Sequence, residues 1–263
     1  MMKEKPDYAT WIPVKLLTTT GITGTVLAVL FGLSFLIPDG PVAIVLRILF
    51  GASALVILCF FGYMSHAHRL LSYEGGGVQG KILDNVLAHL DWDGNGTLLD
   101  IGCGSGALVI KAAKKYPQAQ VIGMDYWGEL WDYNRSQCEA NAQIEGVGSR
   151  VTFRKGDAAK LDFPDASFDA AVSNFVFHEV RSQPDKLALI RLALRVIKPG
   201  GVFAFEDVFF SKTHYPDPEM LMRELSRDVK EIRFVDTRKS SFVPRSLRTP
   251  LVAGQMGLIC GVK

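Results

Sequence analysis

Apolar residues dominate positions 16–64, where only Asp39 and Arg47 carry a charge. This region consists of two apolar stretches, 16–37 and 42–64, separated by a short turn rich in proline and glycine. Each stretch is about 22 residues long, and at ~1.5 Å of rise per helical residue it reaches the ~30 Å of a hydrocarbon core. The pattern predicts two antiparallel transmembrane helices joined by a very short loop.

A different pattern begins after about Ser72. A glycine-rich entry leads into a helical pattern at 81–90, and from there short apolar runs alternate with helical stretches or loops. The predicted strands are 97–101, 120–124, 151–154, 168–173 and 201–205. Such alternation is typical of βα units on a parallel sheet, so we expect an α/β fold with helices on both faces of the sheet. A final pair of runs, 232–235 and 256–262, is expected to close one edge.

Composition agrees with this division. Of the 263 residues, 48% are hydrophobic and 21% are charged, which excludes a disordered chain, and the mean hydropathy of +0.18 is high for a soluble domain. We expect a segment at 1–13, a transmembrane hairpin within 14–66 and a globular domain at 67–263. The net charge of +2 provides no basic field for a nucleic acid. The four cysteines form no CxxC pair, so neither a zinc site nor a disulfide framework is expected.

Basic residues flank the hairpin on one side only. Lys3, Lys5 and Lys15 precede it, Arg69 and Lys81 follow it, and the loop has none. The positive-inside rule then predicts an integral, multi-pass membrane protein with its globular domain in the cytoplasm. Two alternatives remain open: the first stretch is a signal peptide, or both stretches are buried core helices. Arg47 either extends to the membrane interface or contacts a headgroup or a second copy.

The strongest motif is LLDIGCGSG at 98–106, in which an apolar strand runs into a glycine turn followed by a helix at 107–115. Glycines let the backbone approach a ligand, and a helix N-terminus offers unpaired amides. Asp100, just before the glycines, would repel a pyrophosphate but suits a ligand with an ammonium group; the alternative is a helix-capping carboxylate. Asp125 ends the next strand, where a carboxylate can accept hydrogen bonds from a ribose diol.

With these residues the chain resembles the class I S-adenosylmethionine-dependent methyltransferases, which have a Rossmann-like sheet. The matching motifs are LLDIGCGSG at 98–106, VIGMD at 121–125, GDAAKLDFPDASFD at 156–169, SNFVFHEV at 173–180 and RVIKPGG at 195–201. The resemblance implies S-adenosylmethionine as cofactor. It implies the following contacts: Gly102, Cys103, Gly104 and Gly106 around the methionine part, Asp100 near its amino group, Asp125 on the ribose, Asp157 and Ala158 at the adenine edge. Tyr126 and Trp127 either pack on the adenine or are ordinary core or surface aromatics.

The fourth predicted strand ends at Asn174, which we also expect at the cofactor, and the resemblance places the following loop beside the transferred methyl group. His178 and Glu179 in that loop are candidates for a base or for positioning the acceptor, because a neutral imidazole accepts protons near pH 7. The alternative is that His178 only caps or packs on the next helix. Glu206 and Asp207, after the fifth strand, are second-rank candidates. Methyl transfer needs positioning, desolvation and sometimes a base, so no metal is expected.

SNFVFHEV stands where methyltransferases acting on nucleobases carry an NPPY-type element, which argues against a nucleic acid substrate. The motifs look more like small-molecule and lipid methyltransferases, including quinone and sterol types. We expect a membrane-anchored methyltransferase for a small, lipophilic acceptor. The alternatives are a tethered enzyme for a soluble or volatile thiol, amine or metalloid, and a non-catalytic membrane scaffold that binds S-adenosylmethionine. Residues 242–251 mix apolar and basic side chains, as either an interfacial loop or an ordinary surface loop would. The acceptor and the oligomeric state stay open.

Overall fold

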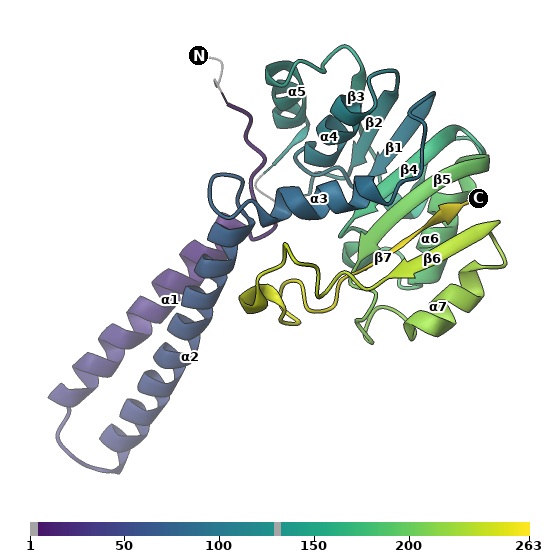
Figure 1. The fold of residues 1–263 in the computed structure, drawn as a ribbon. Coiled ribbons are helices and arrows are strands. Elements are labelled where there is room, and N and C mark those ends of the chain that lie inside the picture. Colours follow the sequence, from purple (N-terminus) through teal and green to yellow (C-terminus); the bar gives the residue numbers. More distant parts are fainter. Residues whose placement is uncertain (1–4, 129–132) are drawn as a thin grey trace. The chain divides into compact units, whose positions relative to one another are not determined.

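The computed structural model describes residues 5–128 and 133–263, so Lys3 lies outside the described residues. The chain forms two compact units (Figure 1). One unit is Thr10–Gly77, and the other combines the segment before Thr10 with Val78–Lys263.

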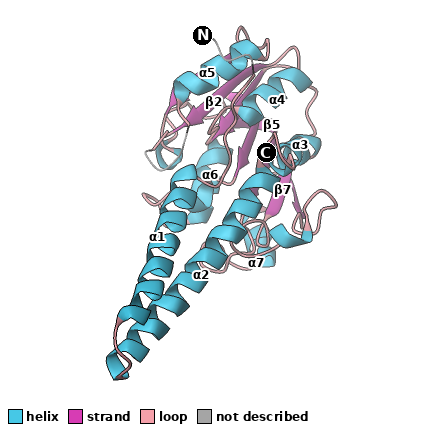
Figure 2. Cartoon of the chain, turned by 90° about the vertical axis from the view of Figure 1, so that its left-hand side faces the viewer, coloured by secondary structure: helices cyan, strands magenta, loops and turns pink. Residues whose placement is uncertain are grey.

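The first unit is a helical hairpin. Helix α1 spans Val14–Leu33 and is followed by the single 3-10 turn η1, Ser34–Leu36; helix α2 spans Pro41–Leu71. In Figure 2 the two helices lie side by side along their length. Both are long and apolar enough to cross a membrane. Few of their side chains are buried, and Ile22 is 65% exposed, so these are not the buried core helices of a globular domain.

The second helix is longer than predicted, since it ends at Leu71 and not at Met64. Its last two turns contain several polar residues. Such residues end an apolar stretch in the sequence, but they do not end a helix. Pro41 occupies the first helical position, where the backbone N–H would have no partner within the helix, so its absence costs no hydrogen bond. Gly40 precedes it as the N-cap.

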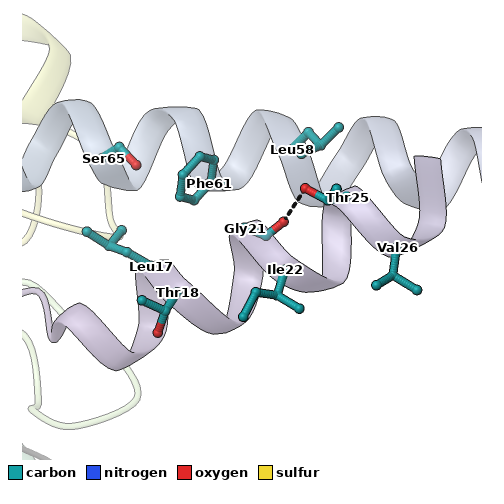
Figure 3. A pocket seen from close by; sticks show the side chains of 9 residues that line it. All are labelled: Leu17, Thr18, Gly21, Ile22, Thr25, Val26, Leu58, Phe61 and Ser65. Carbon is teal, nitrogen blue, oxygen red and sulfur yellow. Dashed lines mark hydrogen bonds between the residues drawn. The ribbon is translucent and has the colours of Figure 1, made fainter. Parts of the chain in front are cut away.

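Glycines let the two helices pack closely. A Cβ at Gly24 would lie 2.7 Å from Leu58, and one at Gly51 would lie 2.9 Å from Phe31. An open cavity of about 660 Å³ is lined by residues of both helices, Phe61 among them. Figure 3 shows the lining side chains, of which the Thr25 hydroxyl donates to the Gly21 carbonyl at 2.8 Å. The hydroxyl is thereby satisfied within its own helix, as an apolar environment requires.

Arg47 folds back onto the loop of the hairpin. Its guanidinium donates to Asp39 at 2.8 Å and to the Ile37 carbonyl at 3.2 Å, and it lies 4.6 Å from the centre of the Phe35 ring. The long side chain thus extends toward the loop end, as expected of a basic residue that reaches for an interface.

The second unit contains a seven-stranded sheet with the order β3-β2-β1-β4-β5-β7-β6. Strands β1 to β5 are parallel and β7 is antiparallel to both β5 and β6. The strands are β1 Thr97–Ile101, β2 Gln120–Asp125, β3 Val151–Lys155, β4 Phe168–Asn174, β5 Ile197–Asp207, β6 Glu231–Val235 and β7 Gly257–Val262. All seven predicted strands are present, and the final pair closes one edge of the sheet as expected.

Helices cover both faces of this sheet (Figures 1 and 2). They are α3 Val78–Ala88, α4 Ala107–Lys115, α5 Arg135–Ile144, α6 Lys186–Arg195 and α7 Pro218–Leu225. Alternate residues of the strands supply the two cores. Leu99, Phe203 and Phe205 pack with α6 and α7 on one face, and the residues between them point to the face covered by α3 and α4.

The site of interest lies where the strand order reverses. Strand β1 lies between β2 and β4, and the connections leave it in opposite directions. In open α/β sheets this arrangement opens a crevice at the carboxyl ends of the strands. Gly102, Asp125 and Asn174 come at or directly after the ends of these three strands, as predicted.

The loop at 242–251 is folded against its own unit. Val243 and Leu247 are buried, and Arg248 donates to the Val243 carbonyl at 2.9 Å, whereas Leu251 is 64% exposed. Two of the apolar side chains in this loop therefore serve its own packing.

Candidate active site

The glycine loop adopts a backbone that other residues disfavour. Gly102, Gly104 and Gly106 all have positive φ angles, of 76°, 54° and 81°. A Cβ at Gly102 would lie 2.2 Å from Val176, so the loop also needs the space that glycine leaves. Helix α4 begins directly after Gly106 and has no side-chain cap, so the N–H groups of its first turn lie next to the loop. The loop can thus accommodate a ligand against its backbone.

Asp100 is a buried carboxylate that is poorly compensated by the described residues. It is 1% exposed, and neither carboxylate oxygen has a hydrogen-bond partner within the described chain. Burial, reinforced by the nearby charge of Asp125, raises the pKa of Asp100 well above its ordinary value, and the Val109 N–H opposes only part of this rise. A cationic ligand would remove this penalty, so the residue fits the ammonium group of S-adenosylmethionine.

Asp125 organises the glycine loop from the neighbouring strand. One carboxylate oxygen accepts the Gly104 N–H at 2.8 Å and the other accepts the Trp127 N–H at 2.7 Å. Burial raises its pKa, and these N–H groups oppose the rise. Each oxygen keeps a lone pair, so the ribose role assigned from the sequence is compatible with the geometry.

The two aromatics after Asp125 differ in their surroundings. The Trp127 indole donates to the Gly104 carbonyl at 2.9 Å, which ties it to the glycine loop, and its φ of 46° is unusual for a bulky residue. Tyr126 is 63% exposed, with the Lys155 ammonium 5.6 Å from its ring centre. Adenine stacking by Tyr126 stays a prediction.

Tyr133 is a site residue that the sequence did not indicate. Its ring comes within 3.4 Å of the position that a Cβ on Gly104 would take, so it lies over the glycine loop. Burial, together with the charge of Asp125, raises the pKa of its phenol. The tyrosine belongs to the segment before α5, where no periodic pattern marks it.

Asp157 and Ala158 follow β3 at the same edge of the sheet. The Asp157 carboxylate accepts the Ala159 N–H at 2.8 Å and so caps the short helix η2, Ala158–Lys160. The carboxylate therefore has a local structural role beside the predicted contact with adenine. Ala158 is buried.

The end of β4 combines an unpaired polar group with backbone strain. The Asn174 side-chain oxygen is buried and has no hydrogen-bond partner among residues 5–128 and 133–263. Phe175 follows with a φ of 54°, a left-handed conformation that is costly for an aromatic residue. Both features occur at the position where the resemblance expects the cofactor and the acceptor to meet.

His178 forms a tight cluster with two carboxylates. It lies in the short helix η3, Phe177–Glu179, with Nδ1 2.5 Å from Asp207 and Nε2 3.3 Å from Glu179. Asp207 is fully buried and also accepts hydrogen bonds from the Tyr215 hydroxyl at 3.0 Å and the Val208 N–H at 2.7 Å. The structure thus brings together His178, Glu179 and Asp207, one of the two second-rank candidates.

The charge of this cluster differs from the sequence-based expectation. Burial disfavours an imidazolium, but Asp207 and Glu179 outweigh it and raise the pKa of His178 to about 10. The imidazolium in turn lowers the pKa values of Asp207 and Glu179. At neutral pH the resting cluster holds one imidazolium between two carboxylates, so His178 is not the neutral acceptor expected from its ordinary pKa.

Glu206, the other second-rank candidate, does not join this cluster. It alternates with Asp207 along β5, so its side chain points to the opposite face of the sheet, where the Thr237 hydroxyl donates to it at 2.7 Å. Its second oxygen has no partner in the part of the chain that the structure describes. Burial raises the pKa of Glu206 to about 8. Within the same described residues no group of His, Cys, Asp and Glu is arranged to hold a metal ion.

Replacing Asp125 with alanine is expected to weaken S-adenosylmethionine binding by roughly 1.5–3 kcal/mol, because the ribose loses charge-assisted hydrogen bonds. The Gly104 N–H also loses its partner. Calorimetric titration measures the dissociation constant, and Asp236→Ala, which removes a part-exposed carboxylate paired with Arg238, serves as control. An unchanged constant in a folded Asp125 variant would exclude the ribose contact.

Comparison with known proteins agrees with this site. Residues 98–201 match the family model described as "Methyltransferase domain". The chain is 34% identical over 106 residues to a sterol 24-C-methyltransferase from Aspergillus fumigatus, covering 40% of this chain and 26% of that protein. It is 30% identical over 152 residues to a 27-O-demethylrifamycin SV methyltransferase from Amycolatopsis mediterranei, covering 58% and 51%. It is 33% identical over 104 residues to a demethylmenaquinone methyltransferase from Deinococcus radiodurans, covering 40% and 39%.

The chain thus spans a quarter to a half of the length of these relatives. Among solved structures, geranyl diphosphate methyltransferase in complex with S-adenosylmethionine superimposes with a TM-score of 0.50 at 15% identity, covering 69% of this chain and 83% of that one. This likeness concerns the fold alone. The matched segment contains the glycine loop, Asp125 and the strand that ends at Asn174. Residues 98–201 are therefore a methyltransferase domain of the class that uses S-adenosylmethionine as its methyl donor.

Proposed function

We propose that the whole chain is a membrane-anchored methyltransferase that transfers a methyl group to a small, lipophilic acceptor such as a quinone, a sterol or another lipid. The observation that carries this proposal is the hairpin of two apolar helices on the same chain as the methyltransferase domain. Residues Ser72–Gly77 connect α2 to α3, so the tether is short. Similarity to sterol and quinone methyltransferases supports the acceptor class.

The residues divide between the two reactants. Asp100, Asp125 and the glycine loop would hold the cofactor, which supplies an electrophilic methyl group. At the carboxyl end of β4, the cluster of His178, Glu179 and Asp207 has a net charge of about −1 at neutral pH, given one imidazolium and two carboxylates. A negatively charged cluster favours removal of a proton from the acceptor and disfavours the binding of an anionic molecule in its place.

Within this cluster the roles follow from exposure. The Asp207 side chain is fully buried, whereas the Glu179 side chain is 47% exposed. Glu179 is therefore the carboxylate that an acceptor reaches, and His178 orients it through Nε2 while Asp207 holds the other ring nitrogen. A proton that leaves the acceptor goes to the Glu179 carboxylate. Before this transfer, the His178 imidazolium compensates the negative charge of Glu179.

Orientation is the second part of the proposal. The basic residues on either side of the hairpin support an orientation with both of its ends in the cytoplasm. Single cysteines at Gly40 and Ser72 test this after replacement of the native cysteines, of which Cys59 is exposed. A membrane-impermeant thiol reagent added to sealed vesicles should label the two positions from opposite sides. Labelling of both from the same side would contradict two spans.

The reaction is tested by incubating the protein with deuterated-methyl S-adenosylmethionine and separate lipid and aqueous cell extracts. Mass spectrometry of the products should find the label in a lipid-soluble compound, and Asp125→Ala should abolish or strongly reduce it. Label only in the aqueous fraction would favour the alternative of a soluble or volatile thiol, amine or metalloid acceptor. Cofactor binding without any labelled product would favour a non-catalytic scaffold.

A further inference from the structure

The segment that precedes the hairpin is hydrogen-bonded to helix α5. The Asp7 N–H donates to the Asn141 side-chain oxygen at 2.8 Å. The Asp7 carbonyl accepts two amide donors from this helix, Asn141 at 2.7 Å and Gln137 at 2.6 Å. Next to it, the Tyr8 hydroxyl donates to Glu145 at 2.9 Å. The peptide groups of Asp7 are thus bound in both directions by side chains more than a hundred residues away in sequence.

Asn141 also reaches the glycine loop. Its Nδ2 donates to the Ser105 carbonyl at 3.1 Å, in addition to Asp7, so both hydrogens of one amide group are used. The side chain is 2% exposed. The opposite orientation of the amide would place its oxygen against two carbonyls and its NH₂ against the Asp7 N–H, so the surroundings fix the orientation. One buried amide group therefore connects the N-terminal segment to the glycine loop.

The contact holds a particular peptide group of that loop. The peptide between Ser105 and Gly106 has its carbonyl bonded to Asn141 and its N–H bonded to the Cys103 carbonyl at 2.8 Å. A peptide group is planar, so fixing both ends fixes its rotation. This rotation sets the start of α4, which begins at the next residue, Ala107, and whose first N–H groups have no intrahelical partner.

We propose that the segment around Asp7 is a part of the cofactor site, which acts through Asn141 as a positioning residue for the glycine loop. Loss of the segment leaves Asn141 with one partner fewer and frees the Ser105–Gly106 peptide to rotate. Affinity for S-adenosylmethionine then falls, although neither Asp7 nor Asn141 is assigned a contact with the cofactor. The inference rests on the glycine loop as the cofactor site and is independent of the proposed acceptor.

The test measures S-adenosylmethionine binding to the full-length protein in detergent by calorimetry, without any acceptor. Asn141→Asp keeps the oxygen that accepts the Asp7 N–H but removes both donated bonds, so the dissociation constant should rise about tenfold. Replacing residues 5–9 with a glycine–serine sequence should raise it by a similar factor. Gln137→Ala is the matched control, because it loses a bond to the same Asp7 carbonyl but has no contact with the loop among its hydrogen bonds. Its constant should stay within about twofold of the parent value.

A combined variant separates positioning from general stabilisation. If the segment acts through Asn141, the segment replacement and Asn141→Asp together should weaken binding no more than either change alone. Additive effects would overturn the route through Asn141. Unchanged affinity in both single variants, with lowered thermal midpoints, would reduce the contacts to a structural role and refute the proposal. If Asn141→Asp does not fold, the variant with residues 5–9 replaced tests the proposal by itself. An unchanged affinity of that variant for S-adenosylmethionine also contradicts the proposal.

Discussion

His178→Ala is expected to lower the turnover number by about 10²–10⁴-fold, the range in which acid–base groups contribute. Removal of the imidazolium leaves two carboxylates without the charge that holds them and leaves Glu179 without its orienting partner. The dissociation constant of S-adenosylmethionine should stay nearly unchanged, because the proposed function assigns His178 to the acceptor and not to the cofactor. Steady-state kinetics with a methyl-transfer assay and calorimetric titration measure the two quantities separately.

Tyr215→Phe is the matched control for this variant. It removes one hydrogen bond to the buried Asp207 carboxylate but keeps the ring packed on Phe209 and leaves His178 in place. Its turnover should fall much less than that of His178→Ala. Modest and parallel losses of turnover and thermal stability in His178→Ala would show that the histidine only packs. Near-normal turnover would mean that Glu179 does not need His178 to orient it, or that the acceptor, such as a thiolate, needs no base.

The pH dependence of the reaction provides a second readout of the same cluster. Since the pKa of His178 is raised to about 10, the imidazolium persists from acid pH through neutrality. The profile of kcat/KM should therefore show no inflection near pH 6.5 from this group. An inflection there that disappears in His178→Ala would mean that the histidine titrates as an ordinary, neutral base.

Glu206→Gln is expected to stabilise the protein at alkaline pH and to have little effect near pH 5. The pKa of Glu206 is raised from 4.5 to about 8, so the folded state retains a proton that the unfolded state loses. The contribution is fully present below pH 4.5 and is lost as pH rises to about 8, which costs about 5 kcal/mol at 1.36 kcal/mol per pH unit. Glutamine keeps an oxygen for the Thr237 hydroxyl and cannot ionise.

Denaturant unfolding at pH 5, 7 and 9 compares the two proteins. The free energy of unfolding of the parent should fall relative to that of Glu206→Gln as pH increases, and Thr237→Val should raise the pKa of Glu206 further, because the lost bond favours the ionised form. Parallel pH profiles of parent and Glu206→Gln would mean that the carboxyl ionises normally in the folded state.

Much of the fold could be predicted because the strands are short apolar runs between helical stretches. The departures have physical causes. Strand β5 begins at Ile197 and not at Gly201, because Phe168 pairs with Ile197 before a register shift and Lys263 exchanges hydrogen bonds with Gly200 and Gly201. A Pro-Gly-Gly sequence is normally a turn signal, and only these long-range pairings make it part of a strand.

In the candidate site, the sequence could indicate those residues whose position follows from the strand next to them. The glycine loop and Asp125 follow strands directly, so spacing alone positions them. Tyr133, Asn141 and Tyr215 reach the site through tertiary packing from helices or loops, and nothing in their neighbourhood marks them. The charge of His178 could not be predicted either, since Asp207 is 29 positions away.

The hydrogen bond between Trp127 and the Gly104 carbonyl gives the protein an intrinsic optical reporter. Indole emission responds to the polarity and hydrogen bonding of its surroundings, and this indole donates to the loop that is expected to hold the methyl donor. Binding of the cofactor at the loop should therefore change the fluorescence of Trp127 directly, without a label on the ligand or the chain. Stopped-flow measurements can follow cofactor association in real time, and Trp127→Phe identifies which part of the signal comes from this site.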